Sequence, residues 1–213
     1  MAKQRCILLI DNYDSFTYNL QHLIQIHSDV LLTVRRNDQD FLSELEQGVF
    51  AGVVIGPGPG SPEDVGYFGH NQEVILRFGT QGLPVLGVCL GFQGIYHSFG
   101  GQLKVAALPM HGKVSRLDIR ESGVLLQSVP SGARVMRYHS ILADLAAQVP
   151  DCFHLTAFTS QDDNVDSVVQ NGTELMALEH RDHPIFGVQF HPESFATEYG
   201  GQMIKNFLRV CRQ

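Results

Sequence analysis

The chain has 213 residues, 44% of them hydrophobic, and a formal net charge of −7. A chain of this length buries roughly 70% of its unfolded surface, so it needs no disulfide or metal in order to fold. The acidic balance argues against a general nucleic-acid binder, which would carry an excess of basic residues. We expect a single domain that spans residues 1–213.

The cysteines and the apolar runs indicate the cellular compartment in which the protein is expected. Cys6, Cys89, Cys152 and Cys211 lie too far apart to form a metal knuckle or a redox pair. They predict free thiols in a reducing compartment. The apolar run Cys6–Ile10 is too short for a signal peptide, and no stretch approaches the roughly 18 apolar residues of a membrane helix. We therefore expect a cytoplasmic protein that contacts no membrane.

Strands and helices are expected to alternate through the first half. Short apolar runs bounded by turn residues predict strands buried on both faces, at Cys6–Ile10, Val30–Val34, Gly52–Ile55 and Val85–Val88. Apolar residues at helical spacing predict helices between them, over 16–27, Phe41–Gln47 and Asn71–Phe78. Asp14 or Ser15 is the expected N-cap of the first helix. This alternation predicts a parallel α/β sheet with right-handed crossovers.

The second half has a different pattern. Strand-like segments separated by short turns predict antiparallel strands at one side of the sheet, at Leu103–Val105, Val114–Ile119, Ala133–Arg137, His154–Thr159, Leu175–Glu179 and Ile185–Gln189. A final helix is expected over Gln202–Cys211, and the polar stretch Gln161–Gly172 predicts an exposed loop. The expected fold is an open, twisted, mostly parallel sheet with helices on both faces.

Gly87-Val88-Cys89-Leu90-Gly91 carries the strongest local signal. It follows an apolar run and precedes a helical segment from about Gln93, so it matches the nucleophile-elbow pattern with Cys in place of Ser. The sharp strand-to-helix turn exposes the sulfur, and the helix N-terminus favours a thiolate. A buried structural cysteine is the alternative at this position, and it remains the interpretation for the other three.

A thiolate nucleophile needs a base, and His191 has the most informative setting of the ten histidines. It lies just beyond an apolar strand, where sites collect in α/β proteins. Glu193 is close enough in sequence to orient its imidazole as the third member of a triad. A strand-end turn with a solvated glutamate is the alternative. His180 and His183 lack further ligands at a matching spacing, so we expect no metal site in this chain.

The loop Gly56-Pro57-Gly58-Pro59-Gly60-Ser61-Pro62 directly follows a predicted strand. Its prolines lack the N–H donors that a phosphate cradle needs, and no Gly-Lys-Ser/Thr follows, so it is not a P-loop. A rigid loop that presents the N–H of Gly58 suits an oxyanion hole, with the N–H of Leu90 as the second donor. A stiff structural turn is the alternative.

Together, Cys89, His191, Glu193 and the Gly58 loop resemble the class I, triad-type glutamine amidotransferases, whose sheet is flavodoxin-like. The resemblance spans nearly the whole chain. The segments that narrow it to the glutaminase component of anthranilate synthase and aminodeoxychorismate synthase are Leu9–Leu20, His111-Gly112-Lys113, Arg137-Tyr138-His139-Ser140 and Gly187–Ser194. The stretch from His191 to Phe207, which contains Phe195–Gly200, is slightly closer to the aminodeoxychorismate type.

The resemblance implies that Cys89 attacks the side-chain amide of L-glutamine and forms a thioester, with His191 and Glu193 managing the protons. It implies that Gly58 and Leu90 stabilise the oxyanion. The residues implied to hold the glutamine are Gly58, Pro59, Gly60, Gln93, Ser140 and Ile141. Ammonia would pass to a separate synthase chain that binds chorismate and Mg²⁺, so no cofactor is expected in this chain. Phe92 departs from the histidine usual in the family, and Ile141 replaces the usual leucine.

Two other functions remain open at this point. A stand-alone Cys-His-Glu hydrolase on a similar sheet is compatible with the elbow alone. A catalytically silent regulatory subunit is a third possibility, against which the intact triad argues. The segments Asp11–Tyr18, Phe92–Tyr96 and Met110–Lys113 are the expected contact surfaces for a synthase partner.

Overall fold

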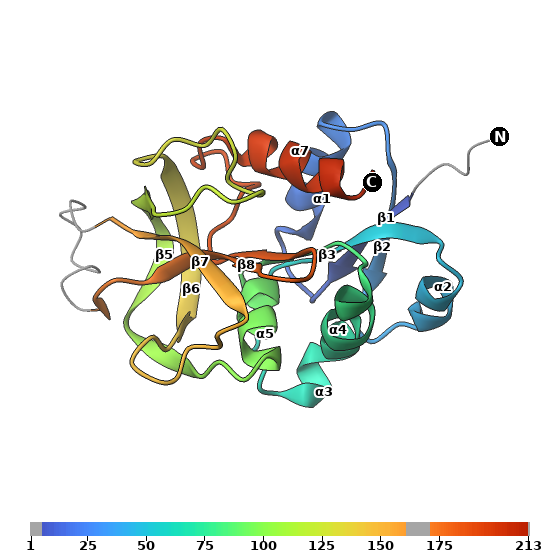
Figure 1. The fold of residues 1–213 in the computed structure, drawn as a ribbon, viewed down its shortest axis with the longest axis horizontal. Helices are drawn as coiled ribbons and strands as arrows, with labels where there is room; N and C mark the ends of the chain where they lie inside the picture. The colour runs from blue at the N-terminus through green and yellow to red at the C-terminus, as the bar shows by residue number, and fades with distance from the viewer. Residues whose placement is uncertain (1–5, 161–170, 213) are drawn as a thin grey trace.

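The computed structural model describes residues 6–160 and 171–212. In this part of the chain, nine strands form a single sheet in the order β2-β1-β3-β4-β9-β8-β7-β5-β6 (Figure 1). The first five in this order are mutually parallel: β2 (Leu31–Arg36), β1 (Cys6–Asp11), β3 (Phe50–Ile55), β4 (Val85–Val88) and β9 (Ile185–Val188). The other four pair antiparallel: β8 (Leu175–His180), β7 (Phe153–Thr159), β5 (Leu103–Ile119) and β6 (Arg134–Ala143).

Helices cover both faces of the parallel half (Figure 1). On one face lie α1 (Thr17–Ile26) and α7 (Gly200–Val210). On the other lie α2 (Leu42–Glu46), α3 (Val65–Phe68), α4 (Asn71–Glu73) and α5 (Leu90–Ser98). A π-helical turn η1 (Val74–Phe78) and a 3-10 turn η2 (Gly79–Gln81) continue from α4.

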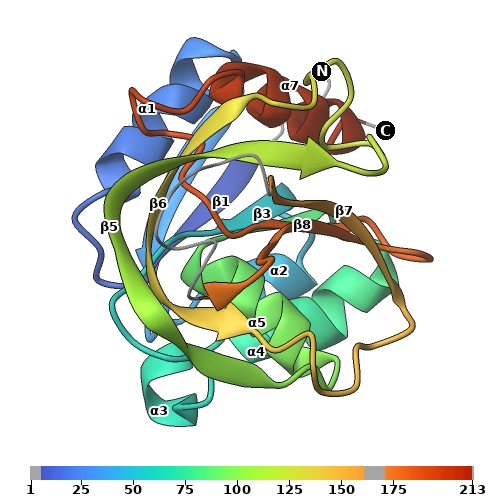
Figure 2. The ribbon, with the colours of Figure 1, turned by 90° about the vertical axis from the view of Figure 1, so that its left-hand side faces the viewer.

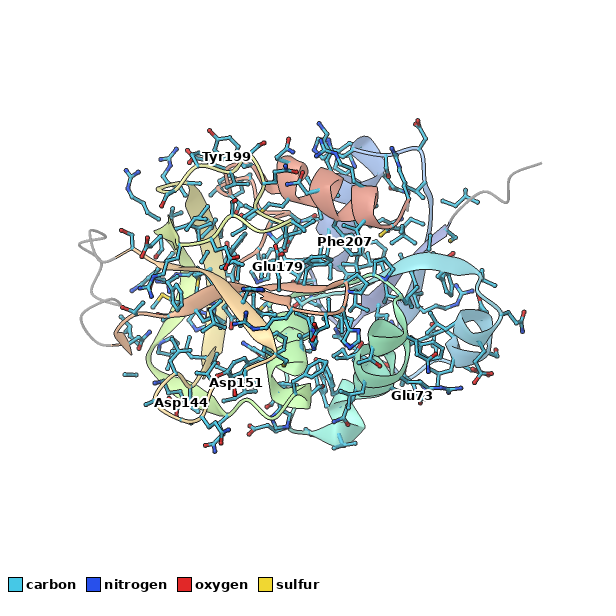
Figure 3. All side chains as sticks on the ribbon, in the orientation of Figure 1. Glu73, Asp144, Asp151, Glu179, Tyr199 and Phe207 are labelled. Atoms are coloured by element: carbon cyan, nitrogen blue, oxygen red, sulfur yellow. The ribbon has the colours of Figure 1, made fainter. Side chains whose placement is uncertain are left out.

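The core has two layers because successive side chains of a strand point to opposite faces. In β1, Ile7 and Leu9 are buried in the layer that includes residues of α1 and α7, whereas Leu8 and Ile10 are buried on the α5 side. Phe207, labelled in Figure 3, lies between α7 and the sheet, with its ring edge-on to that of Phe186 in β9 at 6.3 Å.

The predicted fold class is confirmed: a mixed α/β sheet has helices on both faces and antiparallel strands at one side. The boundaries of the first-half strands differ from the prediction by at most two residues. The prediction of burial on both faces is wrong for β2, which is an edge strand with Leu31 51% exposed.

Several predicted elements differ from the structure. The segment Ile185–Gln189, expected among the antiparallel strands, is β9, which pairs parallel to β4 and antiparallel only to β8. The strand expected over Ala133–Arg137 continues to Ala143 as β6. The segments expected as separate strands at 103–105 and 114–119 are the two ends of the one long strand β5, which curves together with β6 in Figure 2. The helix expected over 71–78 divides into α4 and the π-helical turn. The loop predicted over 161–172 lies, from 161 to 170, outside the described residues.

Three helix starts also differ from the sequence prediction. Phe16, and neither Asp14 nor Ser15, occupies the N-cap of α1, and no side chain caps it. Asp14 Oδ1 instead accepts a hydrogen bond from the N–H of Phe16 at 2.7 Å, so it shapes the turn before the helix. The helix after the elbow begins at Leu90 rather than near Gln93, and the final helix begins at Gly200.

Candidate active site

Cys89 stands between β4 and α5 in a strained backbone conformation, with φ +54° and ψ −101°. Such a conformation is costly for a residue with a side chain, and it recurs at nucleophile elbows. Gly87 and Gly91 are required on either side. A Cβ on Gly87 would collide with the backbone of Gly91, and a Cβ on Gly91 would collide with the carbonyl oxygen of Ile55. The glycine spacing is therefore explained by close backbone approach at the turn.

His191 and Glu193 form a buried pair. Nδ1 of His191 lies 2.6 Å from Oε1 of Glu193, and the two side chains are only 3% and 0% exposed. Burial lowers the pKa of His191, but its interactions with the Cys89 thiolate and with Glu193 outweigh burial and raise the pKa well above 6.5. Hydrogen bonds with both Cys89 and Glu193 contribute to this rise. Cys89, His191 and Glu193 are the residue types of a nucleophile in which an imidazole activates a thiol and a carboxylate holds the imidazole.

Two aromatic rings fix the plane of the His191 imidazole. The ring centroid of Tyr138 lies 5.3 Å from that of His191 in an edge contact, and the centroid of Phe16 lies 5.6 Å away. Phe16 and Tyr138 also stack on each other at 5.2 Å. The segment after β1, expected from the sequence to contact a partner, thus contacts the triad itself.

The Gly58 loop leaves β3 and passes beside the elbow. A Cβ on Gly58 would lie 2.7 Å from Cδ2 of Leu90 and 2.8 Å from Cβ of Asn12, so the loop packs there without room for a side chain. The loop therefore brings Gly58 against the side chain of Leu90, the first residue of α5 after Cys89. Two neighbouring backbone N–H groups beside a nucleophile are what an oxyanion hole requires.

A cavity of about 240 Å³ opens over Cys89. Its lining includes all six residues predicted to hold glutamine: Gly58, Pro59, Gly60, Gln93, Ser140 and Ile141. His111, Tyr138 and His139 complete the lining. Residues from four separate parts of the chain therefore meet at one small pocket.

Gln93 and Gln189 connect the pocket wall to the nucleophile. Nε2 of Gln93 donates to the carbonyl oxygen of Ile141 at 2.9 Å and to Oε1 of Gln189 at 3.2 Å. Nε2 of Gln189 lies 3.8 Å from Sγ of Cys89 as a donor. Gln189 is 1% exposed, and sequence reasoning did not single it out, although it stands two residues before His191.

A buried ion cluster lies behind the pocket. Oε2 of Glu174 is 2.8 Å from Nη1 of Arg137 and 2.9 Å from Nε2 of His139, and all three side chains are nearly inaccessible. Burial lowers the pKa of His139, so the neutral imidazole donates its Nε2–H to the carboxylate. Burial raises the pKa of Glu174, but hydrogen bonding with His139 and the charge of Arg137 outweigh it and lower that pKa. Glu174 is far from its partners in sequence, so no local pattern could have revealed the cluster.

The expectation that Phe92–Tyr96 is a contact surface for a synthase partner is wrong, because Phe92 is buried. Ile95 and Tyr96 are fully buried as well, so this segment is not available as a docking surface. A Cβ on Gly187 would lie 3.0 Å from the ring of Phe92, which shows that α5 packs tightly on β9 there. Met110 is also buried, whereas His111 is exposed and Lys113 is half-exposed at the same edge.

Neither a metal cluster nor a membrane helix is found in the described part of the chain. No group of three or more His, Cys, Asp and Glu side chains there is arranged to hold a metal ion, although the rings of His180 and His183 lie 4.6 Å apart. Among the same residues, no helix combines the length and the apolar character that crossing a bilayer requires.

The model of the glutamine amidotransferase class-I family matches residues 8–211. Anthranilate synthase component 2 of Lactococcus lactis is 42% identical over 207 residues, which cover 97% of this chain and 96% of that protein. Aminodeoxychorismate/anthranilate synthase component 2 of Bacillus subtilis is 40% identical over 209 residues, with 97% of each chain covered.

A solved structure supports the fold. A putative GMP synthase protein from Thermoplasma acidophilum superposes with a TM-score of 0.81 at 24% identity, covering 100% of this chain and 96% of that one. The family match, the full-length relatives and the shared fold agree: this chain belongs to the class I glutamine amidotransferases.

Proposed function

We propose that this protein is the glutaminase subunit of a chorismate-using synthase and supplies it with ammonia from L-glutamine. The observation that carries the proposal is that the strained Cys89 and the Gly58 loop line one pocket of about 240 Å³, while the buried His191–Glu193 pair interacts with Cys89. The full-length likeness to component 2 proteins of L. lactis and B. subtilis supports the synthase assignment.

The proposed reaction begins with attack of the Cys89 thiolate on the side-chain amide carbon of glutamine. The N–H groups of Gly58 and Leu90 would receive the developing oxyanion. His191, kept protonated by its raised pKa, gives a proton to the departing nitrogen, which leaves as ammonia. The same imidazole then removes a proton from water, whose oxygen attacks the thioester carbon. The products are glutamate and a regenerated thiolate, so one water is consumed for each glutamine.

In this proposal, ammonia passes to a separate chain that binds chorismate and Mg²⁺, and the product is anthranilate or aminodeoxychorismate. Both products fit the relatives, because the B. subtilis protein is named for both synthases and the L. lactis protein for one. A cytoplasmic location fits the cysteines, none of which is disulfide-bonded. Exposed His111 lines the pocket, and half-exposed Lys113 follows it by two residues on β5, where a partner would seal the pocket from solvent.

The test compares glutamate release by the purified chain alone and with each of the two synthase components, with chorismate present. We expect slow release alone and faster release with the cognate synthase, because a subunit that hydrolysed glutamine freely would waste it. Cys89→Ser should abolish glutamine-dependent product formation and leave ammonia-dependent synthesis by the partner intact. A stand-alone hydrolase would run at full rate without a partner, and a silent subunit would release no glutamate in any mixture.

A further inference from the structure

Asn12 is a buried polar residue that the proposed mechanism does not use. It follows the last residue of β1 and is 0% exposed. Its Nδ2 donates to the carbonyl oxygen of Gly56 at 2.8 Å, where the loop that carries Gly58 begins. Its own Cβ and carbonyl oxygen lie only 2.8 and 3.0 Å from where a Cβ of Gly58 would stand. Asn12 therefore contacts the loop both at its first residue and at the proposed oxyanion donor.

The orientation of the Asn12 amide is fixed by two other asparagines. Oδ1 of Asn12 accepts hydrogen bonds from Nδ2 of Asn37 at 2.9 Å and from Nδ2 of Asn71 at 2.6 Å. We call Asn12, Asn37 and Asn71 the amide cluster. Rotating the Asn12 amide by half a turn would set its NH₂ against two donors and its oxygen against the carbonyl of Gly56. The cluster thus permits one orientation, in which the NH₂ holds the loop.

Tyr67 makes hydrogen bonds with two members of the amide cluster, Asn12 and Asn37. Its hydroxyl donates to the carbonyl oxygen of Asn12 at 2.7 Å, and its own carbonyl oxygen accepts from Nδ2 of Asn37 at 2.7 Å. The ring covers Gly60, where a Cβ would collide with it. Both ends of the Gly56–Gly60 loop are therefore held by groups that meet at Asn12.

We propose that Asn12 is a positioning residue that, through the amide cluster and Tyr67, sets the place of the Gly58 N–H relative to Cys89. This inference rests on the proposed function, because it takes the Gly58 N–H as an oxyanion donor. An oxyanion donor contributes only when it lies within hydrogen-bond distance of the developing charge, so a small displacement of the loop costs rate. The effect should fall on kcat, since glutamine binding also uses other walls of the pocket.

The experiment measures kcat and KM for glutamine with the synthase partner present, for the parent chain and for Asn12→Ala. One oxyanion donor is typically worth about 10²–10³ in kcat, so a loosened donor should cost about 10- to 100-fold. KM should change by less than about threefold. Alkylation of Cys89 by iodoacetamide should keep the parent rate, because that reaction forms no oxyanion and reports on the nucleophile alone.

Asn206→Ala is the matched control. Asn206 is also a buried asparagine whose Nδ2 donates to backbone carbonyls, those of Leu125 and Gln127, and it lies on α7 away from the pocket. Loss of a buried amide should lower the melting temperature of both variants, but only Asn12→Ala should lose kcat. Equal kcat in Asn12→Ala and in the parent would overturn the inference.

Tyr67→Phe decides the question if Asn12→Ala fails to fold. It removes one hydroxyl and keeps the ring on Gly60, and we expect kcat to fall about 3- to 10-fold at unchanged KM. Tyr96→Phe deletes a buried tyrosine hydroxyl that has no hydrogen-bond partner among the described residues, and it should keep the parent kcat. Parent kcat in Tyr67→Phe would then overturn the inference. Cys89→Ser distinguishes failure of the proposed function from failure of the positioning role. If Cys89→Ser retains glutaminase activity, the proposed function is wrong. If Cys89→Ser is inactive while the Asn12 and Tyr67 variants match the parent, only the positioning role is wrong.

Discussion

The ring of Phe16 lies edge-on to the imidazole of His191, with the two centroids 5.6 Å apart. Phe16 also stacks on Tyr138, whose ring makes its own edge contact with the same imidazole. The turn before α1 therefore supports the proposed base, while Asn12 in the same turn supports the proposed oxyanion loop. One short segment contacts both halves of the site.

Phe16→Leu should lower kcat for glutamine hydrolysis about 3- to 10-fold. An aromatic pair contributes about 0.5–1.5 kcal/mol beyond its buried area, and loss of that amount from imidazole positioning corresponds to this range. Steady-state glutamate release with the synthase partner measures it. Phe153→Leu removes a comparable edge contact between a phenylalanine ring and an imidazole, that of His180 at 5.7 Å, outside the pocket lining; it is the control and should keep the parent rate. Equal rates for Phe16→Leu and the parent would show that the edge contact is only packing.

Gly58→Ala should lower kcat by about 10²-fold or more, as expected for loss of one oxyanion donor. The added methyl would meet Leu90 at 2.7 Å and Asn12 at 2.8 Å, so the loop must move away from the elbow. Gly66→Ala is a matched control, since the nearest atom to its Cβ, Oδ1 of Asp64, lies 3.4 Å away. A well-folded Gly58→Ala variant with the same kcat as the parent would show that the loop is only a structural turn.

The sequence was sufficient for the parallel half of the sheet and for the site residues that stand at strand ends. Cys89 and Gly58 each follow a short apolar run, and the carboxyl ends of parallel strands gather at one edge. The pattern of glycines around Cys89 also predicts the close backbone approach that the structure contains.

The sequence was insufficient where contacts join distant segments. The bond from Asn12 to Asn71 spans 59 positions, and the bond from His139 to Glu174 spans 35. No local periodicity encodes such pairs. The sequence divides the long strand β5 because Pro109 and Gly112 interrupt its middle, whereas pairing with β6 on both sides of them keeps it one strand with shifts of register. Burial of Phe92 was missed because its exposure depends on how α5 packs on β9.

Glu174→Gln should destabilise the fold by about 3 kcal/mol at pH 7, since it removes the negative charge from the buried ion pair with Arg137. The pKa of Glu174 is lowered from 4.5 in the folded chain, so the carboxylate stabilises the fold above pH 4.5 and loses that effect as pH falls through the folded pKa. The gap in unfolding free energy between parent and variant should therefore narrow below pH 4.5. Urea unfolding across a pH series measures it, with exposed Glu63→Gln as control. A gap that stays constant down to low pH would contradict the assigned charge state.

A glutamine-like electrophile, such as a chloroketone analogue, should alkylate Cys89 far faster than the other three cysteines. Cys89 lines the pocket, whereas Cys6 and Cys211 are buried in the core. Cys152 is more accessible, but burial raises the pKa of its thiol and leaves less thiolate. Peptide mass spectrometry after short exposure measures the label at each site. Excess free glutamine should protect Cys89 alone, and label distributed evenly over the four thiols would contradict a glutamine pocket.

Lys113→Glu should remove stimulation by the synthase partner while glutamate release by the isolated chain stays unchanged. Lys113 is half-exposed on β5, one position beyond Gly112 and two beyond His111, which lines the pocket. A charge reversal there opposes a partner that covers the pocket mouth, and like charges across an interface cost several kcal/mol. Lys205→Glu on α7 makes the same charge change beside a different cavity and should leave stimulation intact. Glutamate release is measured alone and against increasing partner concentration. If the partner stimulates Lys113→Glu as strongly as the parent, with half of the maximal stimulation at the same partner concentration, the docking surface does not include this edge. Equal loss in both variants would indicate a general effect of net charge.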